Sequence, residues 1–156
     1  MNRRRLAIIA ILFVGVALGA LREFLFINLN YQIDHVARHT PFSFAHSMFQ
    51  GWVGGFHLHA LIRLKWTLAF AFIALMWLLC VLLARALLGT HRRARLVTFF
   101  FLVVGFVALI LHFASRYAMP GFATVSVKLL HTLQFPVMLF FLWAASFLEP
   151  RSPEGV

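Results

Sequence analysis

The sequence predicts an all-α, polytopic membrane protein: a four-transmembrane-helix bundle with an interfacial or re-entrant segment in its first outer loop. Three observations predict this class. The first two are compositional: 63% of the 156 residues are hydrophobic, and only 12% are charged. A soluble domain uses about a quarter charged residues to cover its surface, so lipid has to be the main solvent here. The third observation is four apolar runs, each long enough for the roughly 20 residues that cross a bilayer.

The predicted spans form a single transmembrane domain over residues 1–156. They are about residues 6–30, 66–88, 96–117 and 126–148, with an outer loop 31–63 and a polar tail 149–156. In the first span, Gly15 and Gly19 are four residues apart, a spacing that lets another helix approach closely. In the fourth, Ser126 is expected to cap the helix and Pro136 to kink it.

The N-terminus admits two interpretations, because three arginines precede a run of apolar residues as in a secretory signal peptide. Cleavage would remove residues 1–19, after a small-residue site. The helical pattern however continues through Phe24, Phe26 and Ile27, where a mature sequence would turn polar. A retained membrane anchor is therefore the preferred prediction.

The formal net charge of +10 is explained by membrane topology. Basic residues flank or interrupt the apolar runs instead of forming a stripe on a polar fold, which argues against a nucleic-acid partner. Arginine clusters at residues 3–5 and 92–95 mark the cytoplasmic side by the positive-inside rule. We expect a protein of a bacterial inner membrane with both termini cytoplasmic and the long loop outside.

The long outer loop alternates aromatic residues with glycine and histidine. Residues 42–52 are expected to form a short helix in the headgroup region. Four histidines of the loop have spacings that suit copper or zinc through imidazole; they are His35, His39, His57 and His59. Asp34 is the only carboxylate of the loop. The same histidines can equally serve as amphipathic or pH-titrating groups at an interface.

Polar side chains of three spans are predicted to lie at one depth. At about 1.5 Å of rise per residue, Arg22 and His112 both lie about 24 Å from the cytoplasmic ends of their spans. The complete predicted layer is Arg22, Glu23, His112, Arg116, His131 and Gln134. Adjacent Arg22 and Glu23 are not expected to pair with each other, so Glu23 is expected to pair with Arg116.

Three uses of this layer stay open. The first is an interhelical network that holds the bundle together. The second is a pocket for an anionic headgroup, a quinone or another small ligand. Bis-histidine ligation of haem by His112 and His131 is the third. Haem and a metal ion are thus the two candidate cofactors, and neither is identified by a motif.

Catalytic motifs are missing from the sequence. The four acids are scattered, no serine lies in a nucleophile elbow, and the single cysteine, Cys80, lies within a span. The sequence therefore favours a non-enzymatic role. We expect an accessory or structural subunit of a larger membrane complex, in contact with lipid and with other subunits or further copies of itself.

Overall fold

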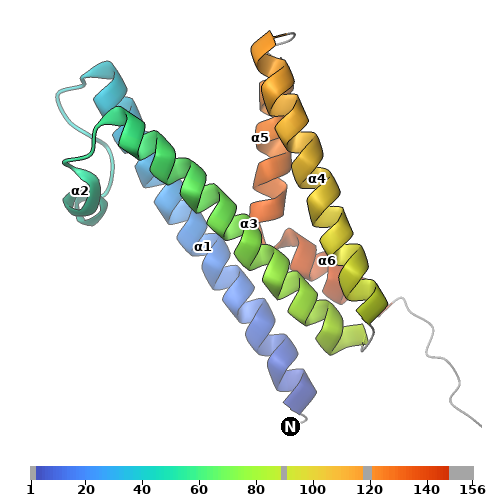
Figure 1. Ribbon diagram of the computed structural model, residues 1–156. Helices are drawn as coiled ribbons and strands as arrows, with labels where there is room; N and C mark the ends of the chain where they lie inside the picture. The colour runs from blue at the N-terminus through green and yellow to red at the C-terminus, as the bar shows by residue number, and fades with distance from the viewer. Residues whose placement is uncertain (1–2, 89–90, 118–120, 148–156) are drawn as a thin grey trace, which may run out of the picture.

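The computed structural model describes residues 3–88, 91–117 and 121–147, and the regular secondary structure among these residues consists of helices only. The helices are α1 (Arg3–Arg38), α2 (Ser47–Val53), α3 (Leu58–Leu88), α4 (His91–Tyr117), α5 (Gly121–Gln134) and α6 (Val137–Ala145). Figure 1 shows α1 and α3 side by side in opposite directions, with α5 beside α4 as a second pair that diverges from the first. The predicted all-α class is confirmed.

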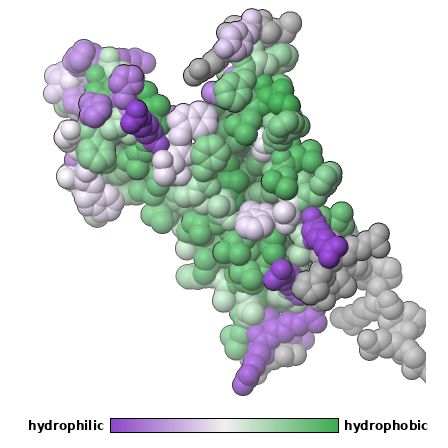
Figure 2. Space-filling view, viewed as in Figure 1, coloured by the Kyte–Doolittle hydropathy of each residue, from purple (hydrophilic) through white to green (hydrophobic). Residues whose placement is uncertain are grey.

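Three helices are long and apolar enough to cross a membrane, namely α1, α3 and the part of α4 from Ala94 to Ser115. Counted together, α5 and α6 form a fourth candidate span within the described residues. Large apolar side chains point outward from these helices, among them Phe13, Phe99 and Phe106, each at least 66% exposed. Figure 2 shows hydrophobic residues over the middle of the molecule and hydrophilic residues toward its ends.

The first two spans are longer than predicted. Helix α1 continues past Asn30 to Arg38, and α3 begins at Leu58 instead of Trp66, so the predicted loop 31–63 is shortened at both ends. The extension of α1 is explained by Asn28, Leu29 and Gln32, which are buried on one side of the helix. Polar residues on an inward face look like the end of an apolar run, although the helical periodicity continues through them.

The fourth predicted span is a broken pair of helices. Helices α5 and α6 meet at an angle of 61° around Phe135 and Pro136, which confirms the predicted kink, because proline cannot donate the helical hydrogen bond. Ser126 is not the helix cap that the sequence predicted, since α5 already begins at Gly121. Its buried hydroxyl instead donates to the backbone oxygen of Ala108 at 2.8 Å and joins α5 to α4.

The break lets α6 pack against the glycine face of α1. A methyl group on Gly15 would overlap the Leu139 side chain, and one on Gly19 would lie 3.0 Å from the Pro136 Cδ. The close helix approach predicted from this glycine pair is therefore confirmed. Leu139 also belongs to a core cluster that includes Met76 and Leu83 of α3, so α6 connects the two long helices.

The segment around α2 is fastened to α1 by one asparagine. The Asn28 side chain donates to the Phe24 backbone oxygen at 2.7 Å and accepts from the His46 backbone N–H at 2.6 Å. Phe49 and Val53 pack into a core cluster with residues of α1 and α3, while Trp52 is 62% exposed. Helix α2 begins at Ser47, later than residue 42 where the sequence predicted it, and its position in a headgroup region stays a prediction.

Candidate ligand-binding cavity

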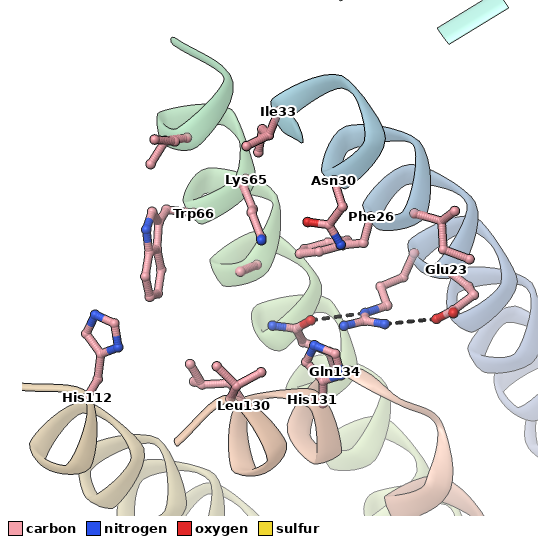
Figure 3. A pocket seen from close by; sticks show the side chains of 15 residues that line it. Glu23, Phe26, Asn30, Ile33, Lys65, Trp66, His112, Leu130, His131 and Gln134 are labelled. Atoms are coloured by element: carbon pink, nitrogen blue, oxygen red, sulfur yellow. Dashed lines mark hydrogen bonds and ion pairs between the residues drawn. The ribbon is translucent and has the colours of Figure 1, made fainter. Parts of the chain in front are cut away.

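A cavity of about 470 Å³ lies between α1, α3, α4 and α5. Five residues of the predicted polar layer line it, from three different helices: Arg22, Glu23, His112, His131 and Gln134. Figure 3 shows these helices around a common space. The sixth predicted residue, Arg116, belongs to α4, but its side chain lies outside the described residues. The structure thus brings the described members of the layer together, while ligand binding by them stays a prediction.

Helical periodicity explains why these side chains face one space. On α1, the lining residues Arg22, Phe26, Asn30 and Ile33 are separated by four, four and three positions. Such spacings place side chains on one face of a helix, one turn above another. The lining residues of α3, from Ile62 to Ala69, follow the same spacing.

Arg22 is the central polar group of the cavity and is only 2% exposed. Its Nε donates to Gln134 Oε1 at 3.1 Å, and its Nη1 donates to Glu23 Oε2 at 3.0 Å, as the dashed lines in Figure 3 mark. The expectation that Arg22 and Glu23 do not pair is wrong. Adjacent residues point about 100° apart around a helix, but the long stem of arginine lets its guanidinium reach the neighbouring carboxylate.

Two aromatic rings lie close to the Arg22 guanidinium. Its carbon atom lies 4.6 Å from the ring centroid of Phe26 and 4.6 Å from that of Phe135. Arginine is attracted electrostatically to such ring faces. Phe135 occupies the break between α5 and α6, so the break that positions α6 also supplies this ring. Neither phenylalanine is among the predicted site residues. The spacing of four residues on one helix would have indicated Phe26, whereas no local pattern indicates that Phe135, one of 19 phenylalanines, faces Arg22.

One nitrogen of the Arg22 guanidinium, Nη2, is unpaired within the described part of the chain. The Nη2 atom is buried, and no hydrogen-bond partner for it occurs among the described residues. A buried, charged donor without an acceptor costs free energy. An acceptor that enters the Arg22 end of the cavity would remove this cost.

Lys65 is a further lining residue that the sequence analysis missed. The predicted second span began at Trp66, which placed Lys65 outside the membrane helix. The signal that would have found it is the spacing of Ile62, Lys65, Trp66 and Ala69, which form one helical face. In Figure 3 the Lys65 side chain extends from α3 into the space between the helices.

The two cavity histidines are in contact with aromatic rings. His112 lies edge-on against Trp66 at 5.2 Å between centroids, and His131 lies 6.4 Å from the ring of Phe135. Both line the cavity, so haem ligation by this pair stays a prediction. An absorption spectrum of protein from haem-replete cells tests it, because bound haem gives a Soret band.

The loop histidines do not gather into one site. His35 Nδ1 forms a hydrogen bond with Thr40 Oγ1 at 2.8 Å, while His39, His57 and His59 are exposed. Asp34 pairs with Arg38 at 2.7 Å. Across residues 3–88, 91–117 and 121–147, no three His, Cys, Asp or Glu side chains lie close enough to hold a metal ion together. Metal binding stays a prediction that elemental analysis tests.

The chain matches no protein-family model, no curated protein and no solved structure. The class of protein is therefore defined by the fold and the cavity. It is an all-helical protein with three or four candidate membrane spans and an amphipathic cavity between them.

Proposed function

We propose that this chain is an integral membrane binding protein that holds an amphipathic molecule, such as a lipid or a quinone, in the cavity. It would act without catalysis, as an accessory subunit of a larger membrane complex. The observation that carries the proposal is the composition of the cavity wall. The wall contains a buried arginine with an N–H group that has no acceptor among the described residues, and apolar side chains such as Ile27, Val127 and Leu130 form much of the rest.

The size of the cavity supports a small-molecule ligand. Ligand pockets commonly have about 300–1,000 Å³ of volume, with a largely apolar wall and a few converging polar groups. The cavity of about 470 Å³ belongs to this range. An amphipathic molecule places its polar head against Arg22 and its apolar part against the remaining wall.

The rim of the cavity supports access from the bilayer. Ile27 and Val127 line the cavity and are also 43% and 48% exposed. They therefore belong both to the cavity wall and to the outer apolar surface. A ligand dissolved in lipid could therefore reach the cavity past these residues without crossing water.

The outer surface supports contact with other membrane proteins. Phe99, Leu102 and Phe106 on α4 are each 66% exposed, and they follow one another at spacings of three and four residues on one helical face. Lipid or a partner helix can cover such a face. We assign the face formed by Phe99, Leu102 and Phe106 to a contact with another subunit.

The proposal is tested by purifying the protein in mild detergent and identifying bound small molecules by native mass spectrometry. We expect an amphipathic molecule in stoichiometric amount. Val127→Trp should reduce its occupancy at least tenfold, because the indole fills the rim. The matched control is Val125→Trp, since Val125 is 46% exposed on the same helix and does not line the cavity. Equal occupancy in both variants would contradict the proposal.

A further inference from the structure

The charges that line the cavity are unbalanced. Two cations, Arg22 and Lys65, face a single carboxylate, that of Glu23. This carboxylate already accepts from Arg22 Nη1. Its side chain is 50% exposed, whereas that of Arg22 is 2% exposed. The charged side chains that line the cavity thus have an excess of positive charge.

Lys65 is not neutralised within the described part of the chain. Its ammonium group forms no ion pair with a described carboxylate, since the pairs found there are Arg22–Glu23 and Arg38–Asp34. Lys65 is half-buried, and its side chain points into the cavity from α3, opposite the α1 helix that carries Arg22 (Figure 3). Two cationic groups thus approach one space from two helices.

We propose that the cavity binds the phosphate group of an anionic amphiphile, with Arg22 and Lys65 as its cationic contacts. This inference rests on the proposed function and specifies the chemical class of its ligand. The phosphate oxygens would accept from the unpartnered Arg22 Nη2 and from the Lys65 ammonium. The apolar chains would lie along Leu130 and leave between Ile27 and Val127.

The donors favour phosphate over a neutral carbonyl head such as that of a quinone. A phosphate group offers several oxygen acceptors and at least one full negative charge. The lysine ammonium supplies three donors and arginine a planar fork, both without acceptors. His112 and His131 add ring nitrogens on the α4 and α5 sides of the same cavity. A neutral head would leave the excess positive charge of the cavity uncompensated.

Three short-chain probes test the inference on the full-length protein in detergent, with affinities measured by calorimetry. They are dihexanoyl phosphatidic acid, dihexanoyl glycerol with the same chains but no phosphate, and inorganic phosphate. We expect phosphatidic acid to bind at least tenfold more tightly than dihexanoyl glycerol, a difference of about 1.4 kcal/mol. Inorganic phosphate should bind more weakly than phosphatidic acid, because it lacks the chains that occupy the apolar wall.

Two variants locate the phosphate preference. Lys65→Gln should reduce the preference for phosphatidic acid over dihexanoyl glycerol at least fivefold, and Arg22→Gln should abolish it. The matched control is Lys128→Gln, because Lys128 is exposed on α5 and does not line the cavity. Since Arg22→Gln also removes a buried interaction and can disturb folding, the Lys65→Gln result is decisive.

The outcomes separate this inference from the proposed function. Equal affinity for phosphatidic acid and dihexanoyl glycerol would overturn the phosphate preference and leave the amphiphile proposal standing. If inorganic phosphate binds as tightly as phosphatidic acid, the result would support the phosphate contacts and overturn the proposal that the ligand is an amphiphile. Binding of none of the three probes would overturn both. An effect of Lys128→Gln equal to that of Lys65→Gln would assign the preference to general surface charge and overturn the cavity site.

Discussion

The half of the α1–α3 pair that faces α6 is closely packed, whereas the half that faces α5 leaves a cavity. In the closed half, Gly15 and Gly19 lie against Leu139 and Pro136 with no room for a methyl group at Gly15. In the open half, Arg22 and Phe26 of α1 line the cavity. Only three residues, about 4.5 Å of helix rise, separate Gly19 from Arg22.

The difference between the two halves originates in the break at Phe135 and Pro136. Helix α6 bends by 61° from α5 and packs against both α1 and α3, whereas α5 lies beside α4 and contacts α1 through its last residue, Gln134. The polar Arg22–Gln134 contact lies at the transition, immediately before the break. A kinked helix thus produces a sealed core and an open cavity from the same pair of long helices.

The largest loss of stability is expected for a substitution in the closed half, where α6 packs against α1 and α3. Leu139→Ala should destabilise the protein by roughly 2–4 kcal/mol, because Leu139 is fully buried and its removal leaves a void. Leu130→Ala is the matched change in the open half and should cost about 1 kcal/mol, since one side of Leu130 already faces empty space. Equilibrium unfolding in detergent measures both. Equal losses would contradict the contrast between the halves.

An intermediate loss of stability is expected when a methyl group is added at a glycine of the closed half. Gly15→Ala should destabilise by about 1–3 kcal/mol, because the new methyl group overlaps Leu139 and forces a shift. Gly105→Ala serves as the control, since nothing lies within 4 Å of a methyl group at that position of α4. Melting temperatures in one detergent compare the two variants. An unchanged melting temperature for Gly15→Ala would show that α6 does not pack there.

The smallest effect concerns the wall of the open half. Ser126→Ala should destabilise by about 1 kcal/mol, because the buried Ala108 backbone oxygen loses the hydroxyl that joins α5 to α4. Thr132→Ala is the control, since its hydroxyl bonds to the Lys128 oxygen within α5 and is exposed. Hydrogen exchange of the α5 amides measures the loosening. Identical exchange in the two variants would exclude Ser126 as a contact that holds the wall.

Part of the candidate site was predictable because depth in a membrane helix follows from counting residues. Arg22, His112 and His131 were placed in one layer by rise per residue alone, and the structure brings them to one cavity. Lys65 was not predictable in the same way, because the start of its helix was misplaced. The Arg22–Glu23 pair was also missed, since side-chain reach is decided by rotamers and neighbours and not by helical spacing.

Four features were predictable from local patterns: the all-helical class, the candidate membrane spans, the glycine face of α1 and the kink at Pro136. These features depend on composition and on local periodicity, which any stretch of chain carries within itself. Three features follow only from the three-dimensional structure: the direction in which α6 turns, the contact of Phe135 with Arg22, and the cavity that Lys65 shares with Arg22. They depend on contacts between residues more than 40 positions apart, and the pattern of one helix does not specify the face that another helix presents to it.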